Sequence, residues 1–233
     1  MVAKTVLLAV LQAAAATAGA LPQRQESCDA VHILIARGSE EPYPGRQSKL
    51  ADAICDGLES CGSEDIVYPA TFSDYCNSAF AGVSNGTAQI TAYAERCPDA
   101  RLVLTGYSQG GHIVGDILGG GGGVIPGQNC TQPTSLPLHL ATSPGDKIVA
   151  AAFFGDVRHT SNQTYNVGTG VAGSGIWPRE GSQLSSLNEF SQSLHSWCLV
   201  DDPVCAGGSD YNAHTAYFDV YTDEAAAWVK TKL

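Results

Sequence analysis

One stretch of the sequence decides the fold. Residues 101–118 read Arg-Leu-Val-Leu-Thr-Gly-Tyr-Ser-Gln-Gly-Gly-His-Ile-Val-Gly-Asp-Ile-Leu. The apolar run Leu102–Thr105 is typical of a buried strand, and the apolar positions after residue 112 fall on one face of a helix. Between them stands Gly106-Tyr107-Ser108-Gln109-Gly110, a G-x-S-x-G pattern in the strand–turn–helix context of a nucleophile elbow. A glycine-rich turn whose serine only caps the helix is the alternative, but this context favours a nucleophile.

Strand-like and helix-like segments alternate along the rest of the chain. We expect strands at residues 30–36, 66–68, 102–105, 148–154 and 190–198, and further helices at residues 47–58, 79–96 and 216–232. This alternation predicts a three-layer α/β/α fold around a parallel sheet of five strands. The five glycines at residues 119–123 are expected to form a flexible connector, and residues 157–189 a long loop.

The first twenty residues predict a signal peptide. Lys4 precedes the apolar run Thr5–Leu11, and Ala18-Gly19-Ala20 resembles a cleavage site. The apolar run is too short to span a bilayer. We therefore expect a secreted protein whose residues 21–233 form a single catalytic domain.

The amino-acid composition argues against several classes of binding partner and cofactor. The chain has 23 acidic residues against 12 Lys and Arg, a formal net charge of −11, which argues against nucleic acid or an anionic membrane as a partner. We expect a monomer. Eight cysteines in a secreted chain predict disulfides, and their spacing matches no zinc pattern, so neither a metal nor another cofactor is expected. Three sequons are candidates for glycosylation, at Asn85, Asn129 and Asn162.

A serine nucleophile needs a histidine base held by a carboxylate. In this type of fold the chain order is Ser, then the acid, then His. His214, just before the last expected helix and in a loop, stands at the position of the base, and His159, after the strand at 148–154, is its rival. The other histidines are expected to have packing roles: His32, His112, His139 and His195.

Two aspartates compete for the role of the acid. Asp156 follows the strand at residues 148–154, at the edge where active-site residues of open α/β sheets gather. Asp202 lies between Cys198 and Cys205, which are close enough to bridge and to hold a carboxylate rigidly. The residues by themselves leave both candidates open.

Five short motifs occur along the chain in a fixed order that can be compared with known families. They are Ala36-Arg37-Gly38-Ser39, Cys97-Pro98-Asp99, the pattern at residues 106–110, Asp202-Pro203-Val204-Cys205 and His214-x-x-Tyr217. Together they resemble the cutinase and acetylxylan esterase family of secreted serine esterases over nearly the whole mature chain. The resemblance implies a cutinase-like α/β-hydrolase fold.

The resemblance also implies roles for individual residues. Ser108 would be the nucleophile, Asp202 the acid and His214 the base. The oxyanion hole would consist of the backbone N–H groups of Ser39 and Gln109, with the Ser39 hydroxyl as a further donor. Without the resemblance, Ser39 reads as a turn residue.

Two disulfides are implied by the same resemblance, Cys28–Cys97 and Cys198–Cys205. For the remaining cysteines we expect Cys55–Cys61 and Cys76–Cys130, although spacing alone does not fix connectivity.

The substrate is inferred from the stretch that leads to His214. Residues 207–213 are polar, with one aromatic residue, Tyr211, that fits against a sugar ring, and residues 155–158 and 165–168 are similar to the acetylxylan esterase branch. We therefore expect an esterase that removes acetyl groups from xylan, a polymeric carbohydrate ester. The alternatives are a cutinase that hydrolyses aliphatic polyester and a non-catalytic carbohydrate-binding protein on the same fold.

Overall fold

A mostly buried parallel sheet forms the centre of the computed structural model, which describes residues 27–233. The expected signal peptide, residues 1–20, lies outside the described residues. The sheet has the order β2-β1-β3-β6-β8-β7, and every neighbouring pair is parallel. Its strands are β1 (Val31–Ala36), β2 (Cys61–Asp65), β3 (Arg101–Tyr107), β6 (Ile148–Phe154), β7 (Asn166–Val167) and β8 (Leu194–Trp197).

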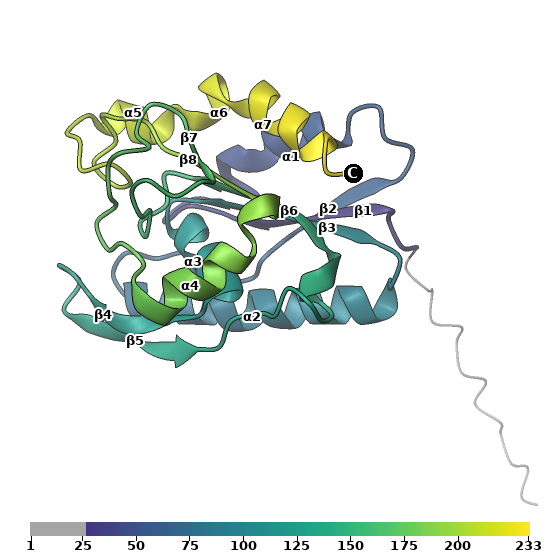
Figure 1. The fold of residues 1–233 in the computed structure, drawn as a ribbon, viewed down its shortest axis with the longest axis horizontal. Coiled ribbons are helices and arrows are strands. Elements are labelled where there is room, and N and C mark those ends of the chain that lie inside the picture. Colours follow the sequence, from purple (N-terminus) through teal and green to yellow (C-terminus); the bar gives the residue numbers. More distant parts are fainter. Residues whose placement is uncertain (1–26) are drawn as a thin grey trace, which may run out of the picture.

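Helices cover both faces of this sheet (Figure 1). One face carries α1 (Ser48–Cys55), α6 (Tyr217–Val220) and α7 (Thr222–Lys230), and the other carries α2 (Tyr75–Arg96), α3 (Gln109–Gly119) and α4 (Gly181–Glu189). Because α2 and α4 both pack on α3, this helix is buried along its whole length. Short elements complete the chain: α5 (Tyr211–Thr215) and the 3-10 turns Gly45–Gln47, Gly145–Lys147 and Ser191–Ser193.

The expected three-layer α/β fold with a parallel sheet is confirmed, with six strands in place of five because the two-residue β7 adds to the edge beside β8. The strand expected at residues 66–68 was misplaced. β2 covers Cys61–Asp65, which pair with Val31–Ile35 of β1. β2 is an edge strand and only partly buried, so it needs no apolar run and escapes a search for one.

The glycine run at residues 119–123 is not a connector, which corrects that expectation. Its last three residues begin β4 (Gly121–Ile125), which pairs antiparallel with β5 (Cys130–Ser135). A Cβ on Gly122 would lie 2.6 Å from the Cα of Thr134, so glycine lets the two strands approach closely. Strand propensity does not predict this hairpin, because glycine is a poor strand former and is present here for the close approach of the two backbones.

Three further segments differ from expectation. The long loop expected at residues 157–189 contains β7 and α4. The single helix expected at residues 216–232 is divided into α6 and α7 at Tyr221. His214 lies on the short helix α5 and not in a loop. In each case the element is too short, or too polar, to show a sustained period.

Four disulfides link these elements within the described residues: Cys28–Cys97, Cys55–Cys61, Cys76–Cys130 and Cys198–Cys205. They are the pairings expected above. Cys76–Cys130 attaches the β4–β5 hairpin to α2, and Cys198–Cys205 closes the loop after β8. Among the helices described, none combines the length and the apolar character that a membrane crossing demands.

Candidate active site

Ser108 stands at a sharp turn between β3 and α3. Its backbone adopts φ 55° and ψ −118°, a conformation that L-residues rarely adopt. The flanking glycines permit the turn, since a Cβ on Gly106 would lie 2.3 Å from the carbonyl oxygen of Gly110, and a Cβ on Gly110 1.8 Å from that of Ala36. The strained turn holds the Ser108 hydroxyl at the carboxyl edge of the sheet.

His214 brings its imidazole between Ser108 and Asp202. Its Nε2 lies 3.0 Å from the Ser108 Oγ, and its Nδ1 lies 2.8 Å from Oδ2 of Asp202. When Nδ1–H donates to the carboxylate, Nε2 is left as an acceptor for the serine proton. The three residues thus form a continuous Ser–His–Asp chain of contacts, although 106 residues separate Ser108 from His214.

Asp202 is fully buried and held by three donors. Oδ2 accepts from His214 and from the Tyr217 hydroxyl at 2.6 Å, and Oδ1 accepts from the backbone N–H of Val204 at 2.6 Å. Burial opposes ionisation of this carboxyl, but the three bonds outweigh burial and lower the pKa of Asp202. Asp202 therefore stays a carboxylate and can orient the imidazole.

Ser39 lies after β1 and lines the same pocket as Ser108. Among the described residues, its buried Oγ has no hydrogen-bond partner. The loop that carries it is fixed by Glu41, whose Oε2 accepts the N–H of Gly38 at 2.9 Å. Gln109 directly follows Ser108 and is the first residue of α3. The first N–H of a helix has no partner inside the helix. A buried hydroxyl without a partner and the first N–H of a helix are the kinds of donor that can bind an oxyanion.

The competing acid and base candidates have other partners. Asp156 accepts from Nη1 of Arg179 at 2.7 Å and from the backbone N–H of Arg158 at 2.9 Å. Nδ1 of His159 contacts Ser196 Oγ at 3.1 Å, and burial lowers the pKa of His159. The side chains of the remaining histidines have partners other than Ser108 or are exposed: His32 stacks on Tyr93, His195 stacks on Trp228, His112 bonds Tyr75 and Asp116, and His139 is exposed.

Two pockets meet at Ser108. One, of about 80 Å³, is mainly apolar, and the other, of about 110 Å³, is more polar. The apolar pocket is lined by Phe72, Tyr75, Ile125, Pro126, Gln128, Val157, Ile176, Val204 and Tyr211. The polar pocket is lined by Ser39, Glu41, Arg46, Phe72, Tyr107, Tyr211, His214 and Thr215.

The residues that line these pockets differ from those on which the sequence-based inference of the substrate rested. Within the described chain, the polar stretch at residues 207–213 contributes only Tyr211 to these two pockets. Three apolar-pocket residues come from the β4–β5 hairpin, Ile125, Pro126 and Gln128, and sequence reasoning missed them because it assigned this region no regular structure. Their only sequence signal is Cys130, which anchors the hairpin beside the site through Cys76.

Other candidate sites are less informative. Across residues 27–233, no group of three or more His, Cys, Asp and Glu side chains is arranged to hold a metal ion. Asn85 lies on α2 and donates to the carbonyl oxygen of Val67 at 2.7 Å. Asn129 and Asn162 are exposed and have positive φ angles, as in turns that present a side chain to solvent.

Known proteins match the whole described chain. The family model described as Cutinase matches residues 27–233. Acetylxylan esterase 2 of Talaromyces purpureogenus is 31% identical over 97% of this chain and 96% of its own length, and Cutinase 11 of Verticillium dahliae is 32% identical over 97% and 76%. The solved catalytic core domain of acetyl xylan esterase from Trichoderma reesei superposes with a TM-score of 0.76 at 31% identity, over 89% of this chain and 100% of that chain. The chain therefore belongs to the cutinase family of carboxylic ester hydrolases.

Proposed function

We propose that the protein is a secreted serine esterase in which Ser108 is the nucleophile, His214 the base and Asp202 the residue that orients the base. The observation that carries this proposal is the chain of contacts from Asp202 through His214 to Ser108, of 2.8 and 3.0 Å. These distances lie within hydrogen-bond reach, as proton transfer from the serine requires.

The reaction follows from these positions. Ser108 Oγ bonds to the ester carbonyl carbon while its proton passes to Nε2 of His214, and the carbonyl oxygen becomes an oxyanion bound by Ser39 and Gln109. The carbon–oxygen bond to the alcohol then breaks, and the alcohol oxygen takes the proton from His214. Water repeats these steps on the acyl-enzyme and releases the carboxylic acid.

The two pockets have different roles in this scheme. The departing alcohol must reach Nε2 of His214, so it occupies the polar pocket, which His214 lines. The acyl group then occupies the apolar pocket, which Ser108 also lines. Its mainly apolar side chains suit the hydrocarbon part of an acyl group.

We infer that the substrate is an acetyl ester of a polysaccharide of the xylan type. The charged and hydroxyl groups of Glu41, Arg46 and Thr215, which line the pocket where a sugar would lie, support this inference. The similarity to Acetylxylan esterase 2 over nearly the full length of both chains is further support.

Hydrolysis of an aliphatic polyester is the second candidate. It is favoured by the apolar lining of the acyl pocket and by the exposure of Ile176 and Phe72 at its rim, 51% and 49%. Apolar chains bind where apolar area is available. The similarity to Cutinase 11 agrees with this candidate.

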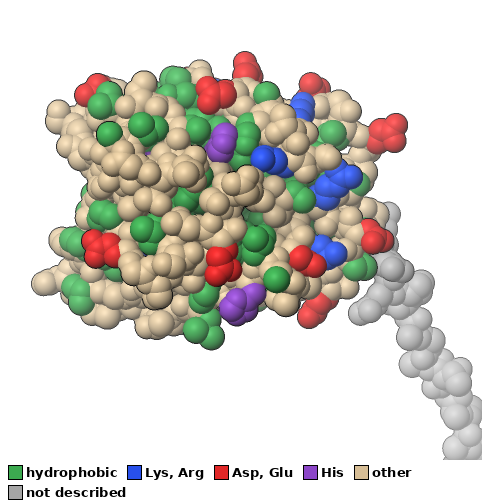
Figure 2. Space-filling model, viewed as in Figure 1, with side chains coloured by type: hydrophobic (Ala, Val, Ile, Leu, Met, Phe, Trp, Pro, Cys, Tyr) green, Lys and Arg blue, Asp and Glu red, His purple; other side chains and the backbone are tan. Residues whose placement is uncertain are grey.

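The proposed location and partners follow from chemistry. Four disulfides within the described residues suit an oxidising, extracellular compartment. The net charge of −11 disfavours nucleic acid and anionic membranes as partners. We propose a monomer that binds a polymeric carbohydrate ester as its substrate. On the face shown in Figure 2, backbone and uncharged polar groups predominate, hydrophobic and acidic side chains are scattered among them, and the Lys and Arg side chains lie in the right half of the view.

A single set of assays tests these proposals. Acetate release from acetylated xylan is compared with hydrolysis of p-nitrophenyl esters of increasing chain length, for the wild type and Ser108→Ala. We expect acetate release and a fall in kcat/KM beyond short acyl chains. Rapid long-chain hydrolysis without acetate release would favour the polyesterase. If an active-site phosphonate labels no single serine, the chain is a non-catalytic binding protein.

A further inference from the structure

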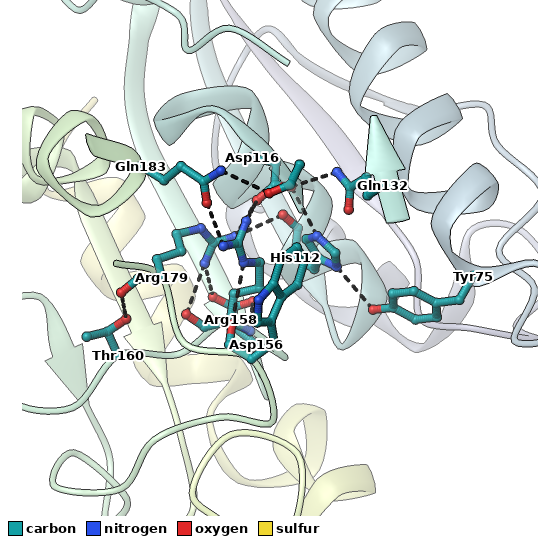
Figure 3. Close-up of polar contacts among 11 residues, drawn as sticks. Tyr75, His112, Asp116, Gln132, Asp156, Arg158, Thr160, Arg179 and Gln183 are labelled. Carbon is teal, nitrogen blue, oxygen red and sulfur yellow. Dashed lines mark hydrogen bonds and ion pairs between the residues drawn. The ribbon is translucent and has the colours of Figure 1, made fainter. Parts of the chain in front are cut away.

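A cluster of charged side chains lies buried beside α3, the helix that follows Ser108 (Figure 3). Asp116, Asp156, Arg158 and Arg179 are each 2% exposed or less. Asp116 lies on α3, while the other three follow β6 or precede α4. Two carboxylates and two guanidinium groups balance in charge, so the cluster is neutral as a unit.

Asp116 and Asp156 share Arg179 but serve different parts of the structure. Arg179 donates from Nη1 to Asp156 at 2.7 Å and from Nη2 to Asp116 at 3.2 Å. Asp116 also accepts from Arg158 at 2.9 Å, from His112 at 3.0 Å and from Gln132 at 2.9 Å, and none of these three residues lines either pocket at Ser108. His112 also contacts the hydroxyl group of Tyr75, which lines the apolar pocket. Asp156, in contrast, fixes the turn that directly follows β6 by accepting the N–H of Arg158.

That turn touches both the nucleophile and the base. The carbonyl oxygen of Phe154 accepts the backbone N–H of Ser108 at 2.9 Å. Gly155 has φ 56°, and a Cβ there would lie 2.9 Å from both Cε1 and Nδ1 of His214. The imidazole therefore rests directly on the Gly155 backbone, and any shift of residues 154–156 changes the position of the base relative to Ser108.

Stability alone does not require such a cluster. Buried ion pairs can often be replaced by apolar side chains of similar volume without loss of stability. The ion pair between Asp156 and Arg179, however, lies next to Gly155, whose backbone contacts His214. This position suggests a role in placing the imidazole.

We propose that Asp156, through its ion pair with Arg179, is a positioning residue that holds Gly155 against the imidazole of His214 and so sets the distance from the base to Ser108. This inference rests on the proposed function, since it takes His214 as the base. A displacement of about 1 Å in a reacting group lowers the rate by about 100-fold. Loss of the ion pair therefore lowers kcat, while KM for a small ester changes little because the pockets keep most of their lining.

The test compares Asp156→Asn with Asp116→Asn. Both variants remove one negative charge from the same buried cluster and from the same Arg179, but only Asp156 adjoins Gly155. kcat and KM for p-nitrophenyl acetate are measured at a temperature where circular dichroism shows both variants folded. We expect Asp156→Asn to lower kcat at least tenfold with KM within threefold, and Asp116→Asn to lower Tm with kcat within threefold.

Equal losses of kcat in the two variants, or no loss in Asp156→Asn, would overturn the inference and leave a purely structural cluster. Gly155→Ala tests the contact itself if Asp156→Asn does not fold, and unchanged kcat in this variant has the same meaning. Ser108→Ala in the same assay separates the two proposals. If it is inactive and the wild type active, the proposed function holds and the Asp156 comparison alone decides the inference.

Discussion

The hydroxyl group of Tyr217 donates a 2.6 Å hydrogen bond to Oδ2 of Asp202. The same oxygen accepts the Nδ1–H of His214, so the tyrosine shares the atom through which the carboxylate orients the base. Tyr217 belongs to α6, and burial raises its pKa, which keeps its hydroxyl protonated as a donor. The tyrosine of the His214-x-x-Tyr217 motif thus supports Asp202, the proposed acid.

Tyr217→Phe removes this donor and leaves the ring in place. A hydrogen bond to a charged group contributes about 1.5–3 kcal/mol, so we expect kcat to fall by roughly tenfold or more as Asp202 loses its fixed orientation. The pKa of Asp202 should rise, because one of the bonds that lower it is lost. Tyr221→Phe is the matched control, since Tyr221 stacks near Tyr217 and makes no contact with Asp202. Equal kcat values for the two variants would contradict this role.

Ser39→Ala separates activity from stability. The buried Ser39 Oγ has no protein partner among the described residues, so its removal should leave Tm unchanged or slightly raised, because a buried unpaired hydroxyl is unfavourable. We expect kcat to fall by roughly 10- to 100-fold, since an oxyanion donor contributes up to about 1000-fold. Ser135 also has a buried, unpaired Oγ but lines neither pocket at Ser108, and Ser135→Ala should keep full activity. A fully active Ser39→Ala would remove its hydroxyl from the oxyanion hole.

Two disulfides of nearly equal span differ in what they hold. Cys198–Cys205, with a sequence separation of 7, closes the loop that holds Asp202, and Cys55–Cys61, with a separation of 6, links α1 to β2. Loop entropy assigns each about 2–3 kcal/mol, so replacing either pair by alanine should lower Tm to a similar extent. kcat should fall only when Cys198–Cys205 is removed, since Asp202 then loses a rigid loop. Thermal unfolding and p-nitrophenyl acetate kinetics on both double variants check this, and equal kcat losses would count against it.

Asp116 should make part of the stability depend on pH. Burial opposes its ionisation, but His112, Arg179 and Arg158 outweigh burial and hold the pKa of Asp116 far below the value of about 3.9 in the unfolded chain. Because the folded pKa is the lower one, the ionised carboxylate stabilises the fold above about pH 4 and this stabilisation is lost as the pH falls further.

Asp116→Asn removes this titration together with one partner of the buried pairs. We expect a loss of about 3–5 kcal/mol at pH 7 and a smaller further drop in Tm between pH 7 and pH 3 than in the wild type. The exposed Asp219, paired with Lys49, provides the control, because Asp219→Asn should change little at pH 7. An unchanged pH dependence in Asp116→Asn would show that Asp116 does not carry this effect.

Local patterns explain which parts of the fold were predictable. β1, β3 and β6 are apolar runs buried on both faces, and α3 has a regular apolar spacing, so their positions follow from the sequence. β2 and the β4–β5 hairpin lack such runs. They form because backbone pairing with β1 and the anchoring of Cys130 by Cys76 are available only in the folded chain.

The sequence by itself determined the elbow, the alternation of strands and helices and, through family motifs, the identities of Ser108, Asp202 and His214 as candidates. Only the tertiary structure gave each aspartate its partner, with Asp202 2.8 Å from His214 and Asp156 2.7 Å from Arg179, and these contacts favour Asp202 as the proposed acid. Both carboxylates follow a strand and both are buried. They differ in the side chain that the fold brings to each. Arg179, 23 positions along the chain, supplies the guanidinium that binds Asp156, whereas His214 on α5 supplies the imidazole that binds Asp202.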